Sequence, residues 1–263
     1  VVGKKSDFDT PLSEFGPVTK VDITIPEGTS KAAVPAAAAS TPEGTALAAR
    51  VAKAYGGEAK LKTITALRRN VKVTAKTPQG DMQIEIDATE IFPDKSVQLM
   101  KTPMGEMTMV ASPAGAFMKM GAMTRDLPTP QKDAMLKEIP QTPMFILGHT
   151  DTLKPLFTVS GKETINGVQT DILDVNVAGA LLRWNVDPEG RILRTWTKGM
   201  EMGQEVEQVN EFSDYRAVDG MQIPFKVVMK RNGEEAGAAE LIEMQVNPTV
   251  DPKTFEKPAA PAQ

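Results

Sequence analysis

The sequence predicts a mainly β protein with a few helices, built on a large antiparallel sheet of about 11–12 strands that must curl or close. Apolar residues recur at every second position along most of the chain; in residues 221–231 they are Ile223, Phe225, Val227 and Met229. Turn signals that contain glycine separate the alternating segments. An open sheet of this size exposes long edges, so we expect it to curl around a helix.

The composition limits the classes of function. The 263 residues suffice for one large domain, and a hydrophobic fraction of 41% can fill a core. A net charge of −4 provides no basic surface, so nucleic acid is not an expected partner. The lack of cysteine excludes disulfides and thiolate metal sites, and the single histidine, His149, excludes most zinc sites. No apolar run reaches the length of a transmembrane helix, so we expect no transmembrane segment.

The N-terminal part of the chain differs from the rest. Residues 1–27 contain short strand-like pieces with too few apolar residues for a core, and residues 28–44 are rich in Ala, Pro, Ser and Thr. A helix through the four alanines is the alternative to a semi-extended linker, but Pro35 and Pro42 bracket these alanines and favour the linker. Because the sequence begins at Val1, we expect a processed product or a fragment, with any export signal upstream.

A helix is predicted to open the main domain, which spans residues 45–256. Leu47, Val51 and Tyr55 fall on one helical face, and two glycines after Tyr55 supply the positive φ that ends the helix. A short second helical turn is expected around Leu61. Strands should then follow in series, each bounded by Gly or Pro, at residues 67–77, 81–91, 95–102, 105–111 and 115–120.

A helical insert interrupts the strand series. Pro128 stands where a helix would start, and Met135, Leu136 and Ile139 have helical spacing. A second short helix is expected at about 142–149. Strands are predicted to resume at residues 154–162, 167–175, 180–187, 190–199, 204–214, 221–231 and 236–247.

Four segments of the main domain resemble the LolA/LolB-like family of periplasmic lipoprotein carriers and related lipid-binding proteins. They are AYGGEAKL at 54–61, the insert near 128–147, GKETING at 161–167 and FSDYRAVDGMQIPF at 212–225. The resemblance implies an incomplete barrel around a hydrophobic cavity that helices cover, no cofactor, and a lipid, acyl chain, lipoprotein or peptide as partner. It also implies export to a bacterial periplasm. Residues 257–263 are expected to be a disordered tail.

Residues 1–27 are similar to the closing segment of insulinase-type (pitrilysin-like) zinc peptidase domains. VVGKKSDFDTPL at 1–12, followed by FGPV at 15–18 and VDITI at 21–25, has the form of that ending. The resemblance implies an accessory domain appended to an exported bacterial zinc peptidase, with the peptidase domain upstream. The inverted His-x-x-Glu-His zinc motif of that family is absent, so we expect no catalytic residue and no metal in this chain.

Seven methionines crowd the middle strands between Met100 and Met123, beside the predicted insert. Because methionine is unbranched and adapts to varied apolar ligands, we interpret them as a soft cavity lining; ordinary core packing is the alternative. The predicted apolar site and its cover comprise Ile84, Ile86, Leu99, Met107, Met109, Phe117, Met118, Met135, Leu136, Ile139 and Phe145.

The insert at residues 126–151 is expected to cover this site. Pro140 and Pro143 divide it into pieces that could move separately as a lid, whereas a fixed plug that completes the core is the equal alternative. The predicted function is a non-catalytic domain that binds a hydrophobic ligand. The alternative is a structural spacer or docking domain with a packed, ligand-free interior.

Other conspicuous side chains are interpreted as structural. Trp184 and Trp196 flank one turn, and we expect them to stack across the hairpin as a cross-strand pair. Before the following corner, we expect either an ion pair of Asp214 with Arg216 or a hydroxyl of Tyr215 that fixes the turn.

Overall fold

A computed structural model describes residues 39–201 and 204–257, so the peptidase-like segment 1–27, most of the linker and most of the tail lie outside the described residues. Within the described ranges, thirteen strands form one antiparallel sheet in the order β6-β5-β4-β3-β2-β1-β13-β12-β11-β10-β9-β8-β7, which confirms the predicted mainly β class. The strands are β1 Ala66–Thr77, β2 Gly80–Ile91, β3 Lys95–Thr102, β4 Gly105–Ser112, β5 Gly115–Met120, β6 Met123–Asp126, β7 Leu156–Ile165, β8 Val168–Val177, β9 Ala180–Val186, β10 Ile192–Glu201, β11 Gln204–Val218, β12 Met221–Arg231 and β13 Glu234–Val246.

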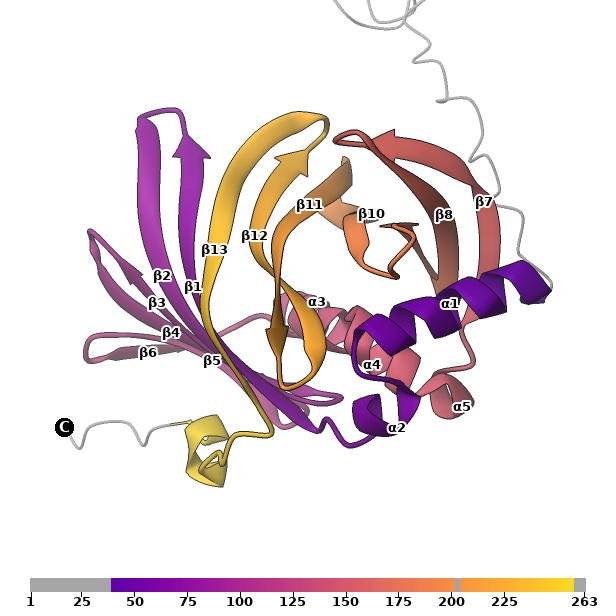
Figure 1. Ribbon diagram of the computed structural model, residues 1–263. Coiled ribbons are helices and arrows are strands. Elements are labelled where there is room, and N and C mark those ends of the chain that lie inside the picture. The colour runs from indigo at the N-terminus through magenta and orange to yellow at the C-terminus, as the bar shows by residue number, and fades with distance from the viewer. Residues whose placement is uncertain (1–38, 202–203, 258–263) are drawn as a thin grey trace, which may run out of the picture. The chain divides into compact units, whose positions relative to one another are not determined.

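The two edges of the sheet are joined by the helical insert. The insert follows β6 and precedes β7, and these strands stand at opposite ends of the strand order. This connection crosses the concave side of the sheet, as Figure 1 shows for α3 and α4. The helical elements are α1 Pro42–Ala54, α2 Glu58–Leu61, α3 Thr129–Glu138, the 3₁₀ turn η3 Ile139–Gln141, α4 Pro143–Gly148, α5 Thr150–Leu153 and the 3₁₀ turn η4 Pro252–Phe255.

The hairpin turns occur at the Asn-Gly and Asp-Gly pairs that the sequence predicted as turns. Asn166, Asp219 and Asn232 have φ angles of 50°, 49° and 51°, and each precedes a glycine that also has positive φ. Two successive residues with positive φ are what a tight two-residue hairpin requires. The strand that the sequence did not predict is β6, because its four residues are too few to show an alternating pattern.

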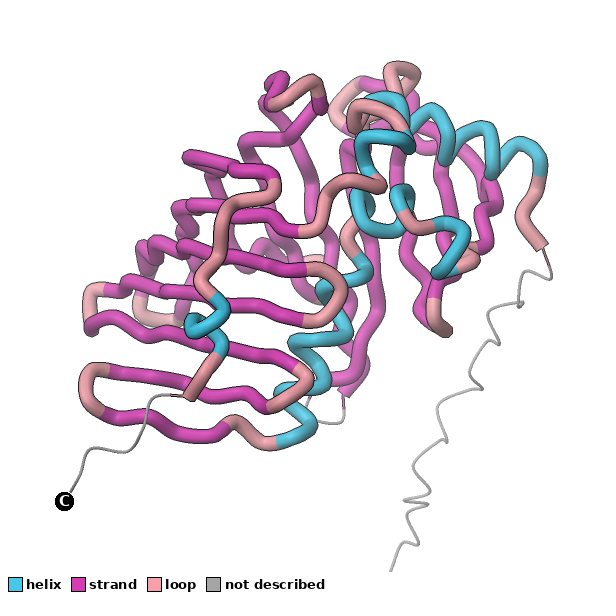
Figure 2. Tube along the Cα trace, turned by 90° about the horizontal axis from the view of Figure 1, so that it is seen from below, coloured by secondary structure: helices cyan, strands magenta, loops and turns pink. Residues whose placement is uncertain are grey.

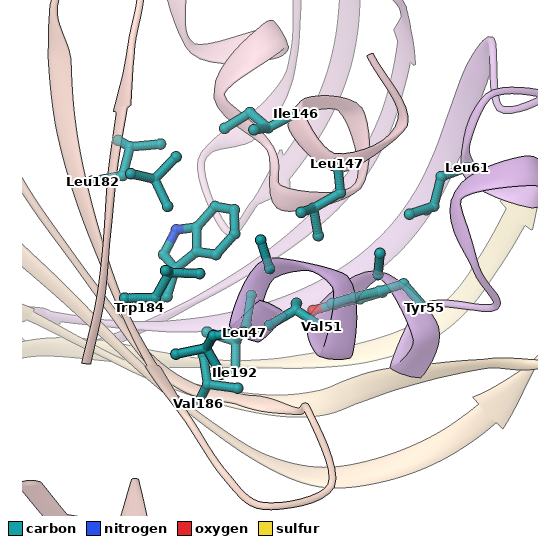
Figure 3. Close-up of a cluster of buried hydrophobic side chains, with 14 of the residues drawn as sticks. Leu47, Val51, Tyr55, Leu61, Ile146, Leu147, Leu182, Trp184, Val186 and Ile192 are labelled. Carbon is teal, nitrogen blue, oxygen red and sulfur yellow. The ribbon is translucent and has the colours of Figure 1, made fainter. Parts of the chain in front are cut away.

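The main core lies between α1, α2, α4 and the strands near β7. Figure 3 shows Leu47 and Val51 of α1 directed toward Trp184 of β9, with Ile146 and Leu147 of α4 close to the same cluster. The helices α1 and α4 therefore complete the apolar core at this end of the sheet.

The first helix is fixed at its N-terminal end. It begins at Pro42, three residues before the predicted start, because proline fits the first helical position, where its missing N–H is not needed. The Thr41 side chain accepts a hydrogen bond from the Gly44 N–H at 3.0 Å. A Cβ on Gly44 would lie 2.2 Å from the Phe157 carbonyl oxygen, so only glycine allows α1 to approach β7 this closely.

The prediction for the two tryptophans is wrong. Trp184 pairs with Thr195 and Trp196 pairs with Arg183, so the indoles lie on opposite faces of the sheet and do not stack. The guanidinium of Arg183 instead lies 5.4 Å from the centroid of the Trp196 ring.

Of the two roles predicted for the residues before the corner that follows β11, the ion pair is confirmed, whereas the tyrosine hydroxyl bonds to β10 and not to the corner. Asp214 and Arg216 form a two-point ion pair, with Nη2 and Oδ2 2.7 Å apart. The Tyr215 hydroxyl donates a hydrogen bond to the Ile192 carbonyl oxygen and so links the end of β11 to β10.

Candidate functional site

A cavity of about 690 Å³ lies on the concave side of the sheet. Its volume falls in the range of about 300–1,000 Å³ that is usual for small-molecule sites. Figure 2 shows, from below, the helical insert running along the interior of the sheet. The lining residues are Tyr55, Leu67, Arg69, Val71, Ala134, Lys137, Glu138, Gln141, Thr142, Pro143, Met144, Ala180, Leu181, Leu182, Trp184, Ile192, Thr195, Thr197, Lys198, Gly199, Gln208, Asn210, Phe212, Ile223, Pro224, Phe225, Lys226, Val227, Ala239, Leu241 and Met244.

The floor of the cavity is apolar and comes from the middle of the sheet. Val71 of β1 pairs directly with Leu241 of β13, and both line the cavity. Val227 of β12 pairs with Phe212 on one side and Ala239 on the other, and all three line it as well. Directly paired residues point to the same face, so these strands present a continuous apolar strip to the interior.

One wall of the cavity carries uncharged polar groups. Thr195 and Thr197 of β10 pair with Asn210 and Gln208 of β11, and all four residues line the cavity. The Asn210 side-chain amide lies 3.5 Å from the Thr195 hydroxyl. Such a wall offers hydrogen bonds to a ligand without adding charge.

The roof of the cavity is α3. Ala134, Lys137 and Glu138 line the cavity and share one helical face. Met135 and Leu136 lie on the opposite stripe, and α3 contacts β3, β4 and β5. None of the α3 side chains is buried, so this helix is loosely held compared with α4, which buries Phe145, Ile146 and Leu147.

An ion pair stands at the β1 side of the cavity. Arg69 lines the cavity, and its Nη2 donates to Oε1 of Glu90 at 2.5 Å. The Nε of Arg69 and the Oε2 of Glu90 are buried and have no hydrogen-bond partner. Besides Arg69, the charged residues Lys137, Glu138, Lys198 and Lys226 line the cavity, so its apolar floor is bordered by several charged side chains.

Tyr55, at the end of α1, adds a neutral polar group to the lining. Burial raises the pKa of the Tyr55 hydroxyl above its usual range, so the phenol stays protonated. In the described part of the chain, no three His, Cys, Asp or Glu residues are grouped so that they could hold a metal ion. None of the helices in the described ranges combines the length and apolar character needed to cross a membrane.

The eleven predicted site residues lie outside the lining of this cavity. Ile86 pairs with Val71, a lining residue, and the row of paired residues continues through Met100 to Met107 and Met120. This row faces the concave side and extends away from the cavity toward β5. Ile84 also shares the cavity face, because it pairs with Val73, which lies opposite the lining residue Ala239. Met118 pairs with Met109 and so belongs to a second row, which continues through Gln98 and Ala88 to the lining residue Arg69.

Leu99 and Phe117 point to the other face of the sheet. Leu99 adjoins Met100 in β3 and Phe117 adjoins Met118 in β5, and neighbouring residues in a strand point in opposite directions. Phe117 pairs with Val110, and both are buried on the convex side, where η4 contacts β3 and β4. These two side chains therefore do not face the cavity.

The residues predicted in the insert divide into two groups. Ile139 and Phe145 are buried, and the Phe145 ring stacks on Phe92 and His149 with centroids 4.8 and 4.1 Å apart. Met135 and Leu136 of α3 stay half-buried. The insert thus contains a packed portion, α4, and a loosely packed portion, α3.

The lining residues that sequence reasoning missed come mostly from β9 to β13 and from the start of β1. One signal for them was present, because Ile223, Phe225 and Val227 had the alternation of a half-buried strand, and all three line the cavity. Alternation identifies a buried face but not whether a helix or an empty space covers it.

Several solved structures from bacteria have a similar fold. A putative outer membrane lipoprotein-sorting protein domain from Vibrio parahaemolyticus is 11% identical, with a TM-score of 0.53 over 81% of this chain and 96% of that chain. A LolA superfamily protein from Nitrosomonas europaea is 11% identical, with a TM-score of 0.54 over 81% and 97%. A DUF1329 family protein from Desulfovibrio piger is also 11% identical, with a TM-score of 0.54 over 82% and 98%.

No protein-family model and no curated protein sequence matches the chain. At 11% identity, the structural likeness establishes the fold and no more. The overall fold of this chain is therefore similar to that of a LolA superfamily protein.

Proposed function

We propose that the described domain binds the hydrophobic part of a lipid, an acyl chain or a lipoprotein in its concave cavity, without catalysis. The observation that carries this proposal is a cavity of about 690 Å³ with an apolar floor, beneath a helix that buries none of its side chains. A spacer domain with a packed interior would have no reason to keep such a volume, because empty apolar space costs stability. The fold shared with a lipoprotein-sorting domain supports the same class of ligand.

Two adjacent alanines of β13 provide a matched test. Ala239 lines the cavity, and Ala238 points to the opposite face, where it pairs with Thr74 and Val228. Ala239→Trp fills the cavity, so we expect the affinity for a fluorescent fatty-acid probe to fall by about tenfold or more. Ala238→Trp should leave the affinity within about twofold, since its indole lies outside the cavity.

Native mass spectrometry of gently purified protein gives the second readout. We expect co-purified lipid in the wild type and its loss in the Ala239→Trp variant. If the wild type neither carries lipid nor takes up the probe, or if both tryptophan variants bind as the wild type does, the proposal of a ligand-binding cavity is wrong.

A finer proposal concerns the protein to which this domain belongs. We propose that it is an accessory domain, appended to an exported bacterial zinc peptidase and acting in the periplasm. Its support is the resemblance of residues 1–27 to the end of such a peptidase domain. The coding sequence upstream tests it: an inverted His-x-x-Glu-His motif is expected there, and a complete upstream region without that motif would contradict the proposal.

A further inference from the structure

Two directly opposed pairs of methionines lie side by side on strands β4 and β5. Met107 pairs with Met120, and Met109 pairs with Met118. Residues two apart in a strand point to the same face, so all four side chains project from the concave face of the sheet. We call these four residues the methionine quartet. None of them lines the cavity, so the quartet is a separate feature of the open end of the sheet.

Further methionines extend the quartet on both sides. Met100 of β3 lies directly opposite one of its members, and Met123 of β6 lies directly opposite another. The remaining direct strand partners of the quartet are Gln98 and Arg125. Thioether sulfur is therefore the prevailing functional group at this site, and none of the direct strand partners carries a carboxylate.

The quartet belongs neither to the core nor to the fully exposed surface. Three of its side chains are half-buried, and that of Met120 is 47% exposed. The helix α3 contacts both β4 and β5 and so shields the quartet in part. Side chains that fill a core are buried, so core packing does not account for the quartet. Its side chains remain accessible to a small ion from solvent.

The spacing of the quartet suits a single ion. Directly opposed side chains on one face of a sheet have Cβ atoms about 5 Å apart, and diagonal neighbours are about 7–8 Å apart. A point above the centre of the quartet therefore lies about 4 Å from each Cβ atom. Methionine is unbranched and has three rotatable bonds, so all four sulfur atoms can turn toward that point.

The chemistry of the quartet selects the kind of ion. Thioether sulfur is a soft and uncharged ligand, and soft sulfur ligands favour Cu(I). Magnesium and calcium need oxygen ligands, and zinc sites use thiolate, imidazole or carboxylate groups, none of which the quartet provides. A monovalent ion also adds only one positive charge beside Arg125, so the repulsion in this half-exposed site is small.

We propose that the methionine quartet binds one soft monovalent metal ion, Cu(I), through its thioether sulfur atoms. The ion exchanges its solvent or carrier ligands for sulfur and keeps its oxidation state. This site is separate from the cavity and does not depend on the lipid ligand proposed there. It departs from the expectation that the chain holds no metal, which rested on cysteine and on zinc motifs.

Leucine substitutions test the site, because leucine keeps the approximate volume of methionine but has no sulfur. Ag(I), a soft monovalent ion that is stable in air, is titrated into the full chain in a chloride-free buffer and followed by calorimetry. We expect the wild type to bind one ion at this site and the double variant Met109→Leu/Met118→Leu to bind it at least about tenfold more weakly. Competition for Cu(I) with a chromophoric chelator, without oxygen, should rank the proteins in the same order.

Two methionines elsewhere in the sheet supply the matched control. Met82 and Met229 are half-buried strand residues, and their direct strand partners are Ala75, Asn210 and Gly237, which lack sulfur. The double variant Met82→Leu/Met229→Leu removes the same number of sulfur atoms, and its affinity for Ag(I) should stay within about twofold of the wild type.

Carbon-13 spectra of the methionine methyl groups identify the ligands. One equivalent of Ag(I) should shift the signals of the quartet and leave those of Met82 and Met229 in place. These shifts in the wild type decide the question even if the quartet variant does not fold, which thermal unfolding would reveal. No binding by the wild type, shifts spread over all methionines, or equal affinities of two folded double variants would overturn the inference. The proposed function would stand in each case, since lipid uptake is measured without the metal.

Discussion

The two ends of the concave side are built differently. At the packed end, which comprises α1, α2, α4 and strands β7–β10, Val51 and Ile146 are 0% exposed in one continuous core. At the open end, which comprises α3 and strands β3–β6, Met120 and Met123 are 47% and 59% exposed. The cavity lies between them. The difference indicates that the packed end holds the fold, and we propose that the open end is the part that rearranges when a ligand binds.

The helical insert belongs to both ends. Its α4 portion is tightly fitted, since a Cβ on Gly148 would lie 2.8 Å from the Leu61 backbone. Its α3 portion carries no buried side chain. We therefore propose that α4 acts as a fixed plug and that α3 is the part that moves. The mobile lid and the fixed plug, which were alternatives for the whole insert, would then each describe one part of it.

Alanine substitutions in the two helices should show the largest contrast. Ile146→Ala at the packed end is expected to lower the free energy of unfolding by about 2–5 kcal/mol, because it removes a fully buried side chain. Leu136→Ala at the open end should cost less than about 1.5 kcal/mol, since that side chain is half-buried. Chemical denaturation measures both, and similar losses would remove the distinction between the two ends.

Amide hydrogen exchange should reveal an intermediate effect within the folded protein. We expect the amides of α3 to exchange faster than those of α4, because few buried contacts oppose local opening of α3. Adding a lipid that binds in the cavity should slow amide exchange in α3 and leave the exchange rates in α4 unchanged. Equal protection of both helices without ligand would contradict a mobile α3.

The smallest expected effect concerns an ion pair that holds α1 on β8. Arg50 Nη2 lies 2.8 Å from Asp171 Oδ2, and this hydrogen bond lowers the pKa of Asp171 from its usual value. A carboxyl group whose pKa is lower in the folded than in the unfolded protein stabilises the folded state at any pH above its pKa in the unfolded protein, which is about 4 for aspartate. This contribution to stability is lost as the pH falls below about 4 and approaches the lower pKa of the folded protein. Asp171→Asn should therefore cost about 0.5–1 kcal/mol at neutral pH.

The pH dependence identifies the cause of that loss. The difference in unfolding free energy between wild type and Asp171→Asn should shrink as the pH falls from 5 to about 3, because the wild-type carboxyl becomes protonated. A difference that stays constant over this range would show that the ion pair is not responsible.

The sequence by itself determined the strand series, most turns and the helical insert. These features follow from local patterns: Asp219-Gly220 and Asn232-Gly233 can adopt the paired positive φ angles of a hairpin, and alternation marks a strand with one buried face. Even the end of α1 and the ion pair of Asp214 with Arg216 could be predicted, because they involve residues close together in the chain.

Only the tertiary structure decided which apolar face encloses the cavity. Met107 and Val227 have the same kind of alternating neighbours, yet α3 and the strands near it separate Met107 from the cavity that Val227 lines. The ion pair of Arg69 with Glu90 was also invisible in the sequence, because the two residues come from different strands whose register brings them together. Alternation assigns a side chain to a face, but the curvature of the sheet and the path of the insert determine what that face meets.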